Sequence, residues 1–183
     1  MKKLYLGSSI ALASLLLLGG CSEKTAVQPA TINISQKCEA PLINYRFHSI
    51  LQGDFNTLDI KSDFVKTHLL KGLKESNCFF QPDSSIYGEY ELKAVYGTSN
   101  NYQKQSHFIK TTTQDDNVIE VQISFSNFRE TRIYTGKAKA SLYSKSYFGV
   151  KDSEAMLSQA EINQTTIDAI NAAIKTAIED FKK

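Results

Sequence analysis

The sequence of 183 residues contains no tryptophan, only three cysteines and three prolines, and nine glycines. It also has no excess of charge of one sign, because 21 Lys and Arg residues stand against 19 Asp and Glu residues. This balance gives no electrostatic reason to expect nucleic acid or an anionic membrane surface as a partner. The composition, with 42% apolar residues, excludes collagen-like, coiled-coil and wholly disordered chains and predicts one compact domain.

An apolar run lies at the N-terminus. Lys2 and Lys3 precede a stretch over residues 4–18 that is shorter than the roughly 20 residues needed to span a bilayer as a helix. The run ends in Leu18-Gly19-Gly20-Cys21, which resembles the lipobox of bacterial lipoproteins, where the peptidase cuts before the cysteine and the thiol carries a diacylglycerol. Residues 1–20 are therefore predicted to be a lipoprotein signal peptide. The alternative is an ordinary secretory signal followed by a free cysteine.

The lipobox resemblance implies an anchored protein, because several acyl chains hold a protein to a bilayer almost permanently. In the resemblance to enterobacterial lipoproteins, Ser22 after the cysteine implies the outer membrane, since an aspartate there would favour the inner one. We therefore expect a protein anchored in the outer membrane and facing the periplasm. Residues 21–37 would be the lipidated cysteine and a flexible polar tether, and residues 38–183 a single periplasmic domain.

Lipidation of Cys21 leaves Cys38 and Cys78 as a pair in an oxidising compartment. If the helix expected over residues 63–77 runs back along the strand expected over 43–51, the two cysteines meet at one end. A disulfide closing a loop of about 40 residues contributes roughly 3 to 4.5 kcal/mol in the chain-entropy model. The alternative is two buried free thiols.

Hydrophobic periodicity predicts four strands and two helices. The strands are expected over residues 43–51, 86–96, 119–126 and 134–142, and the helices over 63–77 and from a cap within 163–166 to residue 181. In the first strand, Tyr45, Phe47 and Leu51 are expected on one face and Ile50 on the other. Strands with one polar face favour an antiparallel sheet. The prediction is an α+β fold of two layers, a four-stranded, mainly antiparallel sheet packed by two amphipathic helices. A short helix over 154–160, continuous with the last one, is a further possibility.

Catalytic signatures are absent from the sequence. His48, His68 and His107 have no His-x-x-x-His or His-Glu-x-x-His spacing and no cysteine at metal-binding distance in sequence. Glu89 and Glu91 share one face of a strand, but nothing supplies the apolar pocket that would separate their pKa values. We therefore expect no enzymatic activity, no cofactor and no metal.

A polar segment over residues 97–117 is the candidate partner-binding site. Its scattered apolar and aromatic residues are Tyr102, His107, Phe108 and Ile109. A loop of this length in a small domain is typically either disordered or functional. The segment is interpreted as a binding loop, and the alternative is a mobile hairpin tip. Part of the segment, residues 106–112, could instead be strand that extends the hairpin.

Basic residues on the expected sheet form a second candidate. Arg132, Lys137 and Lys139 are expected as a row beside Glu89 and Glu91. The preferred interpretation is cross-strand charge pairing on a solvated face, and the alternative is a site for phosphate or glycan.

Two stretches carry a family resemblance. They are Phe64-Val65-x-x-x-Leu69-x-x-x-Leu73-x-x-x-x-Cys78-Phe79 and Tyr90-x-Leu92-x-Ala94-Val95. With the lipobox and the order of elements, they resemble a group of small outer-membrane lipoproteins with an α+β core. The group includes the activator lipoprotein of peptidoglycan synthases, the curli-secretion core, the lipopolysaccharide-assembly lipoprotein and transporter-auxiliary lipoproteins.

The resemblance implies a non-catalytic accessory protein that binds another envelope protein in envelope assembly or transport. The partner would contact a sheet edge or the segment over residues 97–117. No member's binding residues match positions of this chain. The alternative function is a periplasmic lipid- or glycan-binding lipoprotein that uses space between the sheet and the helices.

Overall fold

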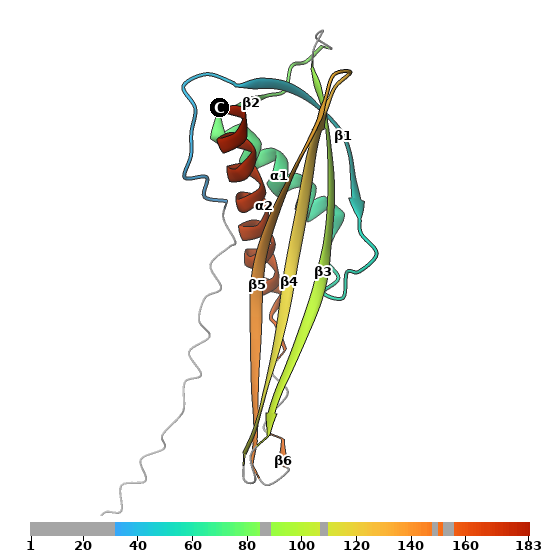
Figure 1. The fold of residues 1–183 in the computed structure, drawn as a ribbon, viewed down its shortest axis with the longest axis vertical. Coiled ribbons are helices and arrows are strands. Elements are labelled where there is room, and N and C mark those ends of the chain that lie inside the picture. The colour runs from blue at the N-terminus through green and yellow to red at the C-terminus, as the bar shows by residue number, and fades with distance from the viewer. Residues whose placement is uncertain (1–31, 85–88, 107–109, 148–149, 152–155) are drawn as a thin grey trace, which may run out of the picture.

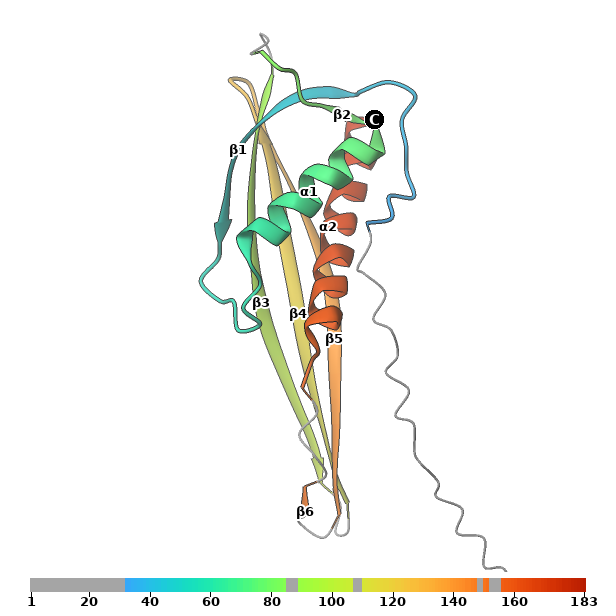
Figure 2. The same ribbon diagram turned by 180° about the vertical axis from the view of Figure 1, so that it is seen from behind.

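The computed structural model describes residues 32–84, 89–106, 110–147, 150–151 and 156–183. Its elements are β1 (Ile43–Gln52), α1 (Ser62–Ser76), β2 (Phe79–Phe80), β3 (Tyr90–Ser106), β4 (Lys110–Ser126), β5 (Thr131–Tyr147), β6 (Val150–Lys151) and α2 (Gln159–Phe181). Figures 1 and 2 show both helices on the same face of the sheet. The predicted α+β fold, a sheet packed by two helices, is confirmed. We call the side covered by the helices the helix face and the opposite side the open face.

The sheet is mixed, with the strand order β2-β1-β3-β4-β5-β6. The pairs β3–β4 and β4–β5 are antiparallel, as predicted, whereas β1 is parallel to both β2 and β3. The pairing is parallel because α1 carries the chain back before β3 begins. The predicted count of four strands is wrong, since the two-residue strands β2 and β6 lie at the two edges.

The polar segment over residues 97–117 is mostly strand, so its interpretation as a long loop is wrong. β3 and β4 pair continuously from Gly97 opposite Glu120 to Ser106 opposite Thr111. The alternative of strand over 106–112 is confirmed at Ser106 and from Lys110 onward; 107–109 lie outside the described residues. The polar sequence of this segment has no apolar alternation, so the usual pattern of a strand was missing although the backbone is paired.

β1 contains a bulge that reverses its predicted faces. Phe47 and Ser49 are opposite consecutive residues of β3, which leaves His48 as the extra residue. Beyond the bulge, Ile50 packs against the core and Leu51 is 59% exposed. The predicted assignment holds before the bulge and fails after it, because one inserted residue inverts a period-two pattern.

α2 begins earlier than the predicted cap within residues 163–166. Its N-cap is Ser158, whose hydroxyl accepts from the amide of Glu161 while the Glu161 side chain accepts from the Ser158 amide. This capping box satisfies two backbone donors at the helix start. Residues 159 and 160 therefore belong to α2, but 156–158 of the possible short helix over 154–160 are not helical, and 154–155 lie outside the described residues.

The core lies between the helix face and the two helices. α2 packs against β5, β4 and α1 and contributes four fully buried isoleucines, namely Ile167, Ile170, Ile174 and Ile178. Close approach is possible because Gly136 of β5 faces the backbone of Ala169 and Ala173. Ile32 is also buried. The predicted tether over residues 21–37 therefore includes at least one residue that packs against the body of the domain.

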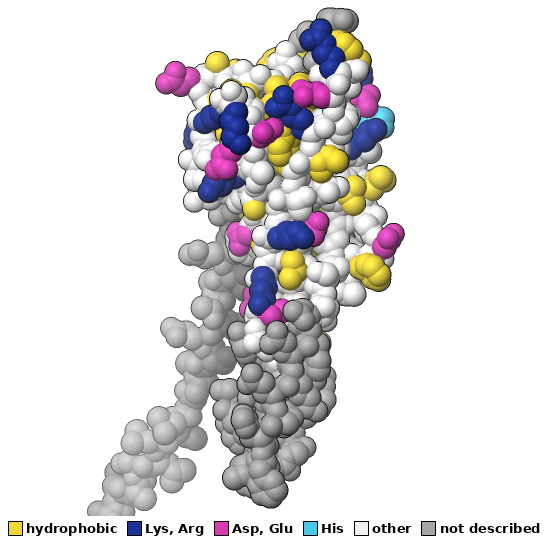
Figure 3. All heavy atoms as spheres, viewed as in Figure 1, with side chains coloured by type: hydrophobic (Ala, Val, Ile, Leu, Met, Phe, Trp, Pro, Cys, Tyr) yellow, Lys and Arg dark blue, Asp and Glu magenta, His cyan; other side chains and the backbone are white. Residues whose placement is uncertain are grey.

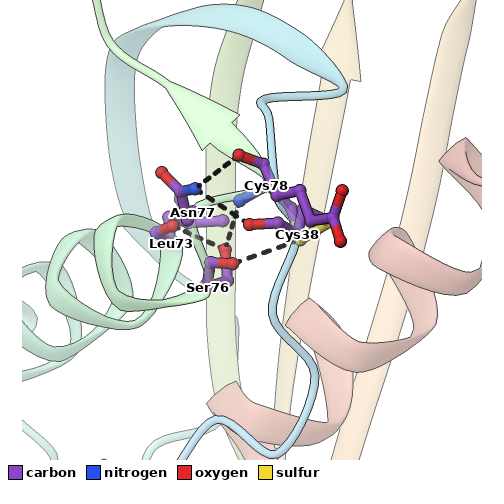
Figure 4. Close-up of a disulfide and its surroundings, with 6 residues drawn as sticks. Cys38, Leu73, Ser76, Asn77 and Cys78 are labelled. Atoms are coloured by element: carbon purple, nitrogen blue, oxygen red, sulfur yellow. Dashed lines mark hydrogen bonds between the residues drawn. A yellow bond between two sulfur atoms is a disulfide. The ribbon is translucent and has the colours of Figure 1, made fainter.

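Cys38 and Cys78 form a disulfide with a Cα–Cα distance of 5.0 Å, which confirms the predicted pair (Figure 4). The end of α1 holds both cysteines in place. The Cys38 amide donates to the Ser76 carbonyl at 3.0 Å, and the Asn77 side chain donates to the Cys38 carbonyl at 2.8 Å. The alternative of two free thiols is therefore wrong for this structure.

Within the described ranges, no helix has the length and apolarity required to cross a membrane. The predicted signal peptide and Cys21 lie in residues 1–31, outside the described residues.

Candidate functional site

Three strands extend past the helices and form what we call the arm. It consists of residues 101–106 of β3, 110–116 of β4 and 141–147 of β5. Figures 1 and 2 show these strands continuing beyond the end of α2. Side chains of the arm are described only for residues 114–116, 141 and 142, and none of these belongs to the hydrophobic core cluster. The arm is a backbone-paired extension beyond the part of the sheet that α2 covers.

Of the four predicted partner-binding residues, only Tyr102 lies in the described part of the chain, and it lies at the base of the arm. Tyr102 lies in β3 opposite Asp115 of β4. His107, Phe108 and Ile109 lie outside the described residues, so the grouping of the four remains a prediction.

A groove on the open face lies where the arm joins the body. After β1, the chain continues beside β3: the Gly53 amide donates to the Tyr96 carbonyl at 2.7 Å, and the Thr98 amide donates to the Phe55 carbonyl at 2.9 Å. The groove has a volume of about 290 Å³. Its lining residues include Asp54, Phe55, Val95, Ser99, Glu120 and Gln122. Phe55 is 70% exposed.

The sequence patterns did not identify this groove as a site. Gly53, Asp54 and Asn56 are turn formers, and turn formers after a strand indicate only that the strand ends. The signal available was Phe55, a large apolar residue inside a polar turn.

Lysines on the open face pair with carboxylates of the neighbouring strand. Lys137 lies 2.7 Å from Glu120, and Lys139 lies 2.5 Å from Asp116. Figure 3 shows basic side chains beside acidic ones on this face. The preferred interpretation as cross-strand pairing fits this geometry, but the partners are not those expected.

The predicted basic row does not exist as one group. Arg132 lies on the helix face of β5, where its guanidinium is 3.2 Å from Asp180 of α2. Glu89 and Glu91 are separated from β5 by β4 and instead lie within 3.9 Å and 3.5 Å of Arg46. The row was misplaced because strand neighbours cannot be assigned from the alternation of single strands.

Asp116 is buried on the open face although it is charged, with 3% exposure. It accepts hydrogen bonds from Lys139, Ser141 and Gln114, and these lower its pKa to about 2. The carboxylate is thus held ionised by its neighbours, which is a structural arrangement.

We expect Asp116→Asn to reduce the acid sensitivity of the fold. A pKa lowered from 3.8 to about 2 means that the charged carboxylate stabilises the folded state above pH 3.8 and loses this effect as the pH falls toward about 2. In urea unfolding at several pH values, the variant should be less stable at neutral pH and should lose less stability across that interval. If the unfolding free energies of the two proteins fell equally between pH 3.8 and about 2, the lowered pKa of Asp116 would be contradicted.

A second polar cluster fastens the C-terminus of α2 to the sheet. Arg132 bridges Glu130 at 3.0 Å and Asp180 at 3.2 Å, while the Tyr134 hydroxyl donates to Asp180 at 2.8 Å. The Tyr90 hydroxyl donates to Glu130. Burial raises the pKa of Tyr134, and the hydrogen bond to Glu130 raises the pKa of Arg132. Each of these groups interacts with another member of the cluster. The cluster therefore stabilises the contact between α2 and the sheet, and none of its members is an unpaired acid or base.

The histidines show no catalytic or metal geometry among the described residues. No group of three or more His, Cys, Asp or Glu side chains there could hold a metal ion. His68 has its ring nitrogen 2.8 Å from the Phe64 carbonyl, and His48 is half-exposed 3.9 Å from Glu91.

The space between the sheet and the helices is filled by side chains. Leu73, Ile123 and Ile170 are fully buried there and belong to one cluster. This packing does not favour a lipid or glycan between the two layers.

Comparison with known proteins gives similarity of fold only. No protein-family model matches the chain, and no curated protein matches it. Among solved structures, a neuraminyllactose-binding hemagglutinin homolog from Helicobacter pylori matches with 7% identity and a TM-score of 0.41, over 81% of this chain and 93% of that one. A Xanthomonas campestris protein of the DUF330 family matches with 9% identity and a TM-score of 0.40, over 82% and 90%. A minor lipoprotein from Acinetobacter baumannii matches with 12% identity and a TM-score of 0.28, over 76% and 92%.

Proposed function

We propose that this chain is a lipid-anchored, non-catalytic accessory protein of the bacterial envelope that binds a partner protein through its arm. The observation that carries the proposal is the length of β3, β4 and β5. Each has 17 residues, and each continues past the helices that the core requires. A paired extension of this kind presents backbone and side chains at a fixed distance from the body, which suits contact with another protein.

The proposed location rests on the sequence of the N-terminus. Cys21 would carry the lipid, and Ser22 would direct the protein to the outer membrane, facing the periplasm. The disulfide agrees with this location, because disulfides persist in oxidising compartments such as the periplasm. Ten residues separate Cys21 from Ile32, which is buried in the body of the domain, and they extend to at most about 35 Å. Ile32 would therefore lie within about that distance of the membrane surface.

The test is removal of the β3 and β4 segments of the arm from the full-length protein in its host. Residues 102–115 are replaced by Asn-Gly, which closes a two-residue hairpin between the paired residues Asn101 and Asp116. We expect the thermal midpoint to change little, because the removed strand segments lie beyond the part of the sheet that the helices cover. Crosslinking to a partner protein should be lost.

Two controls complete this test. Palmitate labelling of the wild type and of Cys21→Ser shows whether the anchor is present, and label should appear only on the wild type. Mass spectrometry of a lipid extract of the purified Cys21→Ser protein tests the alternative, since a stoichiometric bound lipid would favour lipid binding. A partner captured equally by the armless protein would contradict the proposal.

A further inference from the structure

The edge of β3 is covered along only part of its length. β1 pairs with β3 up to Gln52 opposite Tyr96, and the loop after β1 adds the hydrogen bond between Thr98 and Phe55. From Ser99 to Ser106, no strand among the described residues pairs with this side of β3. Figure 1 shows β1 ending partway along β3. At about 3.4 Å per residue, the open edge is roughly 27 Å long.

The direction of the backbone groups along this edge follows from two hydrogen bonds. The Tyr96 carbonyl and the Thr98 amide both point toward the β1 side. Backbone groups of successive residues in a strand point to alternate sides. The backbone amide and carbonyl groups of Asn100, Tyr102 and Lys104 therefore point away from β4, toward the uncovered edge of β3. Those of Asn101 and Gln103 point toward β4.

Other edges of the sheet are protected against strand addition. The outward edge of β1 is interrupted by the bulge at His48. β5 is an edge strand over most of its length and carries Lys137 and Lys139 on its open face, where they pair with Glu120 and Asp116 of β4. Bulges and edge lysines are the usual means by which proteins discourage unwanted pairing. The first five residues of the open β3 edge, Ser99 to Gln103, are uncharged.

The groove at the start of this edge adds a preference for side-chain type. It lies on the open face, beside Ser99, and contains exposed Phe55 and Val95. Two carboxylates also line it, Asp54 and Glu120, of which Glu120 is paired with Lys137. No described residue pairs with Asp54. The groove thus suits an aliphatic stem that ends in a positive charge, as in Lys or Arg.

We propose that the open edge of β3 from Ser99 to Ser106 is the docking site of an extended segment of a partner protein, which adds to the sheet as a strand and places a Lys or Arg side chain in the groove beside Asp54. The inference deepens the proposed function by naming the surface and the form of the partner. Main-chain hydrogen bonds supply the binding and the groove supplies the selectivity, as in other complexes formed by strand addition.

A proline substitution separates this edge from the rest of the arm. Asn100→Pro removes one outward amide and places the ring on the open side, while the pairing with β4 stays intact. Asn100→Ala retains the amide and is the matched control. Thr135→Pro is the equivalent change on the open edge of β5, because the register directs the Thr135 amide away from β4.

The readout is photocrosslinking in the native host, with the full-length protein carrying p-benzoylphenylalanine in place of Gln122 beside the groove, or in place of Ile133 on β5. We expect the Gln122 position to crosslink to one contiguous segment of one partner protein. Asn100→Pro should lower this yield about ten-fold or more, since it removes a hydrogen bond and adds a steric block. Asn100→Ala and Thr135→Pro should leave the yield nearly unchanged, and Asp54→Lys should lower it by charge repulsion.

Folding of the variants is followed independently by amide hydrogen exchange. In the free protein, Asn100, Tyr102 and Lys104 should exchange faster than Asn101 and Gln103. In Asn100→Pro, the protection of Asn101 and Gln103 should persist, which shows that the edge was changed and the arm retained.

Each other outcome overturns the inference. These outcomes are an unchanged yield in Asn100→Pro, an equal loss in Asn100→Ala, crosslinks only to a second copy of this chain, and crosslinks to a helical segment of the partner. A partner captured from Ile133 and never from Gln122 would refute the β3 edge and leave the proposed function standing. Capture of no partner at either position would refute both.

Discussion

Among the glycines that the structure describes, Gly136→Ala is expected to destabilise the domain most. A Cβ at Gly136 would overlap the Ala169 carbonyl oxygen and the Ala173 amide nitrogen, both of them backbone atoms of α2. Side chains can rotate away from a new methyl, but a helix backbone can only move as a unit. Overpacking typically costs about 1–3 kcal/mol, and we expect the upper end of this range or more. Urea unfolding measures the loss.

Two variants isolate the cause of this effect. Gly53→Ala adds the same methyl where the nearest neighbour is 3.3 Å away, so its loss should be much smaller. Gly136→Ala combined with Ala169→Gly should not recover stability, because the clashing carbonyl oxygen remains. Recovery in the double variant, or equal losses at Gly136 and Gly53, would show that backbone contact between α2 and β5 is not the limiting feature.

The elements with a continuous apolar stripe were predictable from the sequence. α1 and most of α2 follow the spacing of buried residues, and the covered parts of β3, β4 and β5 follow the period of two. Pairing is a property of two strands, so the parallel arrangement of β1 and the bulge at His48 could not be obtained from β1 alone. The Ser158–Glu161 capping box could have been recognised in the sequence. The start of α2 was predicted too late because it was inferred from the apolar stripe, which begins further along the helix.

The candidate site was less predictable than the fold. Polar composition over residues 97–117 gave no apolar alternation, and this concealed the strands that the backbone pairing forms there. Backbone pairing of this kind is set by the neighbouring strand, and no hydrophobic pattern records it. The groove beside Phe55 depends on the loop after β1 lying against β3, a contact between residues about 40 positions apart in sequence.

Removal of the disulfide is expected to have the second large effect. Cys38 and Cys78 are separated by 40 residues, and a loop of this length corresponds to about 4 kcal/mol in the chain-entropy model. The bond also ties the segment that contains Ile32 to the end of α1, so its loss should loosen that segment as well. The unfolding free energy of oxidised and reduced wild type, compared in urea, gives the effect of the crosslink without any change of side chain.

The double variant Cys38→Ala/Cys78→Ala separates the crosslink from the packing of the sulfur atoms. Cys78 is fully buried, so the variant loses apolar contacts in addition to the bond and should be somewhat less stable than the reduced wild type. Reductant should destabilise the wild type and leave the double variant unchanged. Equal stability of oxidised and reduced wild type would mean that the hydrogen bonds from Cys38 and Asn77 hold this end of the domain without the bond. In that case the disulfide would give no reason to place the protein in an oxidising compartment.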